Sequence, residues 1–199
     1  MTDRPIPDLD AAQSILDFWL GVPGTSDHAG PRGIWFKKDA AFDASIREQH
    51  GKDYENARNG FYDDWELSGP TSLALVITLD QFPRNLFRDD ARAFATDEKA
   101  LAVAQSAITQ GFDTVAPPHH RIFYYMPFEH SEDIIMQKRC LDLIKTMPEF
   151  EMKDGYYVYA VQHHKIIQRF GRFPHRNKIL GRESTPEEIE FLTQPGSGF

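Results

Sequence analysis

One segment of the chain has the composition of a buried strand and no partner to pair with. Residues 72–79, SLALVITL, are apolar nearly all round and rich in β-branched residues. A strand in a core needs a neighbouring strand for its backbone N–H and C=O groups, and no second run of this kind occurs in the sequence. We therefore predict a buried helix from Pro70 to about Gln81, in an all-helical chain.

The other periodic segments begin and end at ordinary helix signals. Glycine follows several of them, as it does at many helix C-termini. Thr185 and Glu188 form a capping-box pattern, Ser131 is a predicted cap, and Pro127 is expected to end a helix. Helices are predicted at 9–20, 39–59, 70–81, 92–110, 118–126, 132–146, 155–170 and 186–193. Their short connections predict antiparallel helix pairs in a single all-α domain spanning 1–199.

The composition bears on partners and compartment. With a net charge of −8 and a pI near 5.4, the chain attracts nucleic acid and anionic membranes weakly. Its longest apolar run, residues 73–79, is too short to span a bilayer, and no secretion signal is visible at the N-terminus. Cys140 is predicted to be a small buried hydrophobe. We expect a cytoplasmic protein that binds neither nucleic acid nor membrane, with an oligomeric state that the sequence leaves unknown.

Positive charge gathers in one short segment of this acidic chain. Residues 165–182 hold six cations and no carboxylate, so the other residues carry 16 cations against 30 anions. Lys165 and Arg169 suit the C-terminal end of a helix, but Arg172, Arg176 and Arg182 lie beyond it. Arginine binds carboxylate or phosphate at two points. The segment is therefore predicted either to form an anion pocket or to fasten the C-terminal part to carboxylates elsewhere.

Two ionisable residues fall on apolar helix faces. Asp80 shares the stripe of Ile77, and His163 shares that of Ile167. A buried carboxylate must be paired, and Arg84, four residues further on, is its natural partner. Each residue has a structural interpretation beside the catalytic one. Asp80 can form an ion pair with Arg84 that fixes the end of a helix, and His163 can be a hydrogen-bonded core histidine.

A short motif occurs twice, as QFPRN at 81–85 and as RFPHRN at 172–177. Each copy follows a predicted helix, which proline prevents from continuing. Both copies are predicted to be stiff helix exits that hold an Arg and an Asn in set directions. We expect them to surround one centre, where Asp80, Arg84, His163, Arg172 and Arg176 converge.

His130 and Glu132 flank the predicted cap. With His163 and His175 they offer the side-chain types that bind metals. Their spacing matches neither the Glu-x-x-His pairs of di-iron bundles nor His-Glu-x-x-His. The sequence also contains no Gly-rich phosphate loop and no dinucleotide fingerprint. We predict no metal and no cofactor.

Six segments, in order along nearly the whole chain, carry a family resemblance. They are ILDFWLG, LDQFPRN, AFATDEKAL, PFEHSED, FGRFPHRN and LGREST, of which FGRFPHRN at 170–177 is the most specific. The chain resembles the bacterial "domain of unknown function 924" (DUF924) family. The resemblance implies one all-helical domain of the tetratricopeptide-like, α-α superhelical type, in agreement with about seven to nine helices. It implies no established activity.

These observations predict a polar pocket that binds a small anionic molecule, and they leave open whether the protein is an enzyme. The candidate ligand-binding residues are Arg84, Asn85, Arg172, His175, Arg176 and Asn177. If there is chemistry, His163 or His130 would act as acid or base, with Asp80 or Glu132 fixing the imidazole. The alternative is a tetratricopeptide-like module that captures an acidic peptide segment or a C-terminal carboxylate, which rests on fold analogy.

Overall fold

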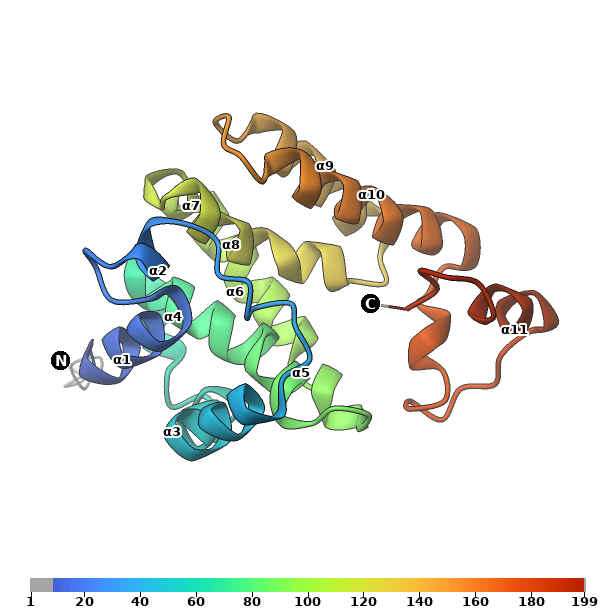
Figure 1. Ribbon diagram of the computed structural model, residues 1–199, viewed down its shortest axis with the longest axis horizontal. Helices are drawn as coiled ribbons and strands as arrows, with labels where there is room; N and C mark the ends of the chain where they lie inside the picture. Colours follow the sequence, from blue (N-terminus) through green and yellow to red (C-terminus); the bar gives the residue numbers. More distant parts are fainter. Residues whose placement is uncertain (1–8, 199) are drawn as a thin grey trace, which may run out of the picture.

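Helix α4, Gly69–Asp80, runs through the middle of the molecule (Figure 1). In the computed structural model, which describes residues 9–198, this helix is buried continuously from Thr71 to Asp80. The helices that pack around it are α1 (Leu9–Leu20), α3 (Ala40–Arg58), α6 (Asp97–Thr109) and α8 (Pro118–His130). Residues 9–198 contain no strand, so the all-α prediction and the helix predicted at 70–81 are confirmed.

Burial on all sides decides the conformation of this apolar segment. Pro70 stands in the first turn, where its missing N–H is no loss. The hydroxyls of Ser72 and Thr78 donate to the carbonyls of Gly69 and Ala74 at 2.9 and 2.8 Å, so they are satisfied within the same helix. Packing thus overrides the weak helix propensity of the β-branched residues.

The remaining helices lie on either side of α4. Helices α9 (Ile134–Thr146) and α10 (Lys153–Phe170) lie side by side and pack on α8, whereas α3 and the short α5 (Phe82–Leu86) lie on the other side of α4 (Figure 1). The shorter elements, with η for a 3₁₀ helix, are α2 (Ser26–Ala29), η1 (Asp63–Leu67), η2 (Ala91–Phe94), α7 (Phe112–Val115), η3 (Pro174–Arg176) and α11 (Pro186–Leu192). The superhelical stacking implied by the family resemblance stays a prediction.

Two predicted helix boundaries are wrong. Helix α8 continues through Pro127 to His130, although proline removes the N–H that would bond to the Phe123 carbonyl. This part of α8 is buried among other helices, so packing outweighs the lost hydrogen bond. The helix predicted at 92–110 is divided into η2 and α6 at Thr96, whose hydroxyl donates to the Leu79 carbonyl at 2.6 Å.

The predicted helix caps are partly correct. Asp133, rather than Ser131, caps α9, because its carboxylate accepts from the Ile135 N–H at 2.7 Å. The capping box of Thr185 and Glu188 at the start of α11 is confirmed. A correct helix start can therefore be placed from sequence when two capping groups occur together.

Residues 171–198, which we name the C-terminal arm, lie at one end of the molecule (Figure 1). Gly171 adopts the left-handed conformation, with φ of 69°, and ends α10 there. A small apolar cluster separate from the main core joins the arm to α10, and it contains Ile166, Ile167 and Phe173 with Phe170 and Phe191 packed on it. No helix within residues 9–198 has both the length and the apolar character needed to cross a membrane.

Replacing Ile77 by Ala should lower the free energy of unfolding by about 2 to 5 kcal/mol, because the fully buried side chain leaves a cavity in the core. The matched control is Ile135→Ala in α9, where the residue is 67% exposed and the change should stay below about 0.5 kcal/mol. Urea unfolding followed by circular dichroism measures both. Equal losses in the two variants would contradict the central position of α4.

Candidate functional site

A row of alternating charges joins three helices to the C-terminal arm. The Asp80 carboxylate lies 3.5 Å from Arg84 Nη1, and the two Nη atoms of Arg84 donate to the Asp97 carboxylate at 2.9 and 3.1 Å. Arg176 Nη1 donates to the same carboxylate at 3.3 Å. We name these four residues, together with His130, the ion-pair centre.

Helix ends bring these side chains together. Asp80 is the last residue of α4, Arg84 lies in α5 one turn later, and Asp97 is the first residue of α6. Pro83 and Pro174 stand in the first turns of α5 and η3, so the repeated Phe-Pro motifs start short helices that follow the long ones. Through these short helices, both motifs direct their arginines to one carboxylate.

Arg176 is more enclosed than Arg84, with 8% of its side chain exposed against 20%. Its guanidinium carbon lies 4.6 Å from the ring centre of Phe94 and 4.5 Å from that of Phe173. Its Nε is buried and has no hydrogen-bond partner among the described residues. Burial, together with the nearby charge of Arg84, lowers the pKa of Arg176 to about 10, so the group stays charged at neutral pH.

Asp80 orients the imidazole of His130. Nδ1 of His130 lies 2.8 Å from Asp80 Oδ1, and since a carboxylate only accepts, Nδ1 carries the proton. Burial alone would raise the pKa of Asp80, but the charge of Arg84 and the contact with His130 lower it to about 2. Burial and the charge of Arg84 lower the pKa of His130. The imidazole is therefore neutral at pH 7, with Nε2 as its basic nitrogen.

A second buried pair lies beside the ion-pair centre, between Glu129 of α8 and His163 of α10. His163 Nδ1 is 3.1 Å from Glu129 Oε1 and 2.9 Å from the Tyr159 carbonyl oxygen. Burial, together with the charge of Asp80, raises the pKa of Glu129 to about 8, and burial lowers the pKa of His163 to about 3. Although only 3.1 Å separates them, both groups are therefore neutral at pH 7 and do not form an ion pair.

Arg172 lies outside the ion-pair centre, although we expected it to converge there. It donates to both oxygens of Glu188 at 2.7 and 2.8 Å, and Asn177 Nδ2 donates to the same carboxylate at 3.2 Å. Arg182 donates to both oxygens of Glu132 at 2.6 and 2.9 Å. These side chains fasten the arm to itself and to the segment that precedes α9.

Two further predicted residues also lie outside the row of charges. Asn85 Nδ2 donates to Asp43 at 2.8 Å. The ring centre of His175 is 5.6 Å from that of Phe173, and burial, with the charge of Arg176, lowers the pKa of His175 to about 4. The predicted residues that the structure brings together are Asp80, Arg84, His130, His163 and Arg176.

Two residues of the site were not predicted from sequence. Asp97 lies in the first turn of a helix, where the helix dipole favours a carboxylate. That local role is a sufficient reason for a carboxylate there, so the sequence does not indicate the contacts with Arg84 and Arg176. Glu129 follows Pro127 and lies beyond the predicted end of that helix. The signal that could have found Asp97 is its place within the AFATDEKAL motif.

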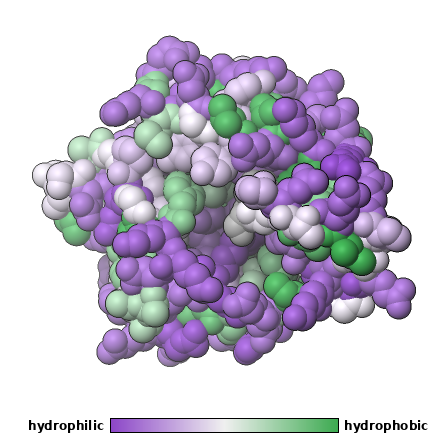
Figure 2. Space-filling model, turned by 45° about the vertical axis from the view of Figure 1, so that its right-hand side comes forward, coloured by the Kyte–Doolittle hydropathy of each residue, from purple (hydrophilic) through white to green (hydrophobic). Residues whose placement is uncertain are grey.

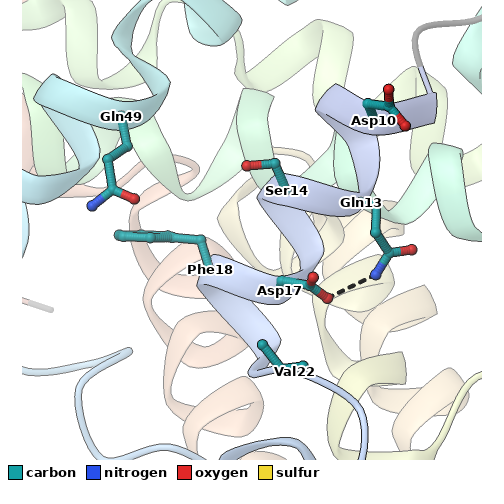
Figure 3. A pocket seen from close by; sticks show the side chains of 7 residues that line it. All are labelled: Asp10, Gln13, Ser14, Asp17, Phe18, Val22 and Gln49. Atoms are coloured by element: carbon teal, nitrogen blue, oxygen red, sulfur yellow. Dashed lines mark hydrogen bonds between the residues drawn. The ribbon is translucent and has the colours of Figure 1, made fainter.

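A pocket of about 540 Å³ between α1 and α3 is lined by Asp10, Gln13, Ser14, Asp17, Phe18, Val22 and Gln49 (Figure 3). Its lining holds carboxylates and no cation, so it does not suit an anion.

Figure 2, with the C-terminal side brought forward, shows a hollow near the middle of the face whose visible floor is hydrophilic. Among residues 9–198, no group of three or more His, Cys, Asp or Glu side chains is placed to hold a metal ion.

Comparison with known proteins gives a family and a structural neighbour. The family described as bacterial protein of unknown function (DUF924) matches residues 15–196. A solved structure of a protein of unknown function from Agrobacterium tumefaciens is 42% identical in sequence, covers 92% of this chain and 97% of that chain, and has a TM-score of 0.82. No curated protein matches this chain.

Replacing Glu129 by Gln should change how stability depends on pH. The folded state keeps the Glu129 proton up to about pH 8, whereas a free glutamate loses it near 4.5. Between these values the folded state binds more protons, so the wild type loses stability as the pH rises. The variant lacks this loss. Its free energy of unfolding minus that of the wild type should therefore increase by up to about 1.4 kcal/mol for each pH unit.

Urea unfolding at unit steps from about pH 5 to pH 8 measures this difference. The control is Glu149→Gln, at a side chain that is 87% exposed, which should follow the wild-type profile. Parallel profiles for Glu129→Gln and the wild type would mean that Glu129 is ionised in the folded protein.

Proposed function

The chain belongs to the DUF924 family of bacterial proteins of unknown function, and we propose that it binds a small anionic molecule at the ion-pair centre. One observation carries the proposal, namely that Arg176 is almost fully buried and uses little of its hydrogen-bonding capacity. A guanidinium has five N–H donors. Among the described residues, the guanidinium of Arg176 makes one hydrogen bond, the 3.3 Å contact with Asp97, and its Nε is buried without a partner.

This state of Arg176 is unfavourable without a ligand. A buried donor left unpaired costs about 1 to 3 kcal/mol, and more when it is charged. Asp97 does not remove that cost, because it accepts from Nη1 of Arg176 and leaves Nε without a partner. A carboxylate or phosphate that accepted from Nε and Nη2 of Arg176 would form the two-point contact for which arginine is suited.

Arg172 illustrates the contact that Arg176 lacks. Its Nε and Nη2 donate side-on to the two oxygens of Glu188. Arg176 offers the same edge, and the rings of Phe94 and Phe173 contact its guanidinium. Because these aromatic contacts limit the movement of the guanidinium, less conformational entropy is lost when an anion binds.

Small anions should stabilise the wild type and should not stabilise Arg176→Met. At a hundredfold excess over Kd, acetate, phosphate or sulfate should raise Tm by about 5 to 10 °C. Methionine occupies similar space beside the rings but offers no donor, and Asp97 keeps its two bonds from Arg84. Thermal melts at constant ionic strength measure the shift without a general salt effect.

Two matched substitutions separate anion binding from stability. Arg172→Met removes the contact with Glu188, so it should lower Tm and keep the anion shift. Arg169→Met breaks an exposed pair with Glu187 and should leave both quantities unchanged. A wild type that responds to none of the anions, or an Arg176→Met variant that responds like the wild type, would refute the proposal.

A further inference from the structure

Without a ligand, the ion-pair centre is electrically balanced. Arg84 and Arg176 carry two positive charges, and Asp80 and Asp97 carry two negative ones. A bound anion would add one negative charge among side chains of which at most 20% is exposed. An unbalanced charge is costly where water is largely excluded.

His130 is placed to restore the balance. Its Nδ1 donates to Asp80, which leaves the lone pair of Nε2 to accept a proton. The side chain is 11% exposed, and no hydrogen bond to Nε2 is found among the described residues. The imidazolium formed would lie 2.8 Å from an ionised carboxylate, which stabilises it.

The titratable and charged groups around His130 come from each element packed at this end of α8. They are Asp80 of α4, Arg84 of α5, Asp97 of α6, Glu129 of α8, His163 of α10, and His175 and Arg176 of η3, with Cys140 of α9 next to Glu129. Glu129 and the Cys140 thiol already hold their protons at pH 7, since burial raises the pKa of both. Burial lowers the pKa of His163 and of His175 far below 7.

We propose that each anion bound at the ion-pair centre is accompanied by one proton, which is taken up at Nε2 of His130. The inference rests on the proposed function. An N–H bond forms at Nε2, and the proton comes from the buffer or from the acid form of the ligand, whose O–H electron pair stays on oxygen. The favoured ligand is a small monocarboxylate, because one proton balances one negative charge and a dianion would leave one unbalanced.

Acetate is the probe that tests this inference, because it stays ionised well above pH 5 and brings no proton of its own. Calorimetric titration at pH 7, in buffers of different ionisation enthalpy, should give close to one proton taken up per acetate bound. The acetate affinity should fall by up to tenfold for each pH unit between about pH 6 and pH 8. Sulfate, a dianion throughout this range, should bind more weakly than acetate at equal ionic strength.

His130→Gln should abolish proton uptake at pH 7 and remove the fall in acetate affinity between about pH 6 and pH 7, where Glu129 still holds its proton. Its amide can still donate to Asp80. The matched control is His164→Gln, one residue beyond His163 in α10, which should behave as the wild type. If His130→Gln does not fold, imidazole nitrogen NMR of the wild type replaces it, and acetate should convert the His130 signal to that of an imidazolium.

The possible results distinguish this inference from the proposed function. Acetate binding without proton uptake, uptake that persists in His130→Gln, or an unchanged His130 signal would overturn the inference and leave anion binding intact. The same holds if sulfate binds and acetate does not. A wild type that binds none of acetate, phosphate and sulfate would refute both.

Discussion

Two distant parts of the chain meet at the carboxylate of Asp97. It accepts from Arg84, 13 residues earlier in the sequence, and from Arg176, 79 residues later. Its place at the start of α6 adds the favourable field of the helix N-terminus. Removing one partner of a buried pair costs about 3 to 5 kcal/mol, since the remaining charge is left without compensation. The turn from α4 to α5, the start of α6 and the position of the arm therefore depend on this one group.

Ion pairs explain why an acidic chain gathers its cations in one segment. The arm has only a small apolar cluster with which to pack on α10. Arg176 and Arg182 reach carboxylates of the helical body at Asp97 and Glu132, and Arg172 closes the arm on Glu188. Two-point arginine contacts add direction as well as energy. Charge complementarity thus holds the arm, and Arg176 alone of these three cations meets its carboxylate through a single long hydrogen bond.

The predicted helices succeeded where local signals agreed with burial. α1 spans the predicted range, and the capping box placed the start of α11. Pro127 does not end α8, because the packing of helices around α8 outweighs the one lost backbone bond. Glu129 therefore lies in α8 and beside the ion-pair centre, where the sequence did not predict it. The phase of α4, by contrast, placed Asp80 inside correctly, since helical periodicity is a local property.

The sequence by itself determined that this chain is all-helical, that Asp80 and His163 face inward, and that two arginines follow matching Phe-Pro turns. These features depend on neighbours within a few residues, so they can be inferred from the order of side chains. Only the tertiary structure decided that Arg176 shares Asp97 with Arg84 while Arg172 binds Glu188. An arginine side chain is long and flexible and can reach several carboxylates, so its partner is chosen by helix packing. The residues next to an arginine in the sequence therefore do not identify the carboxylate that it binds.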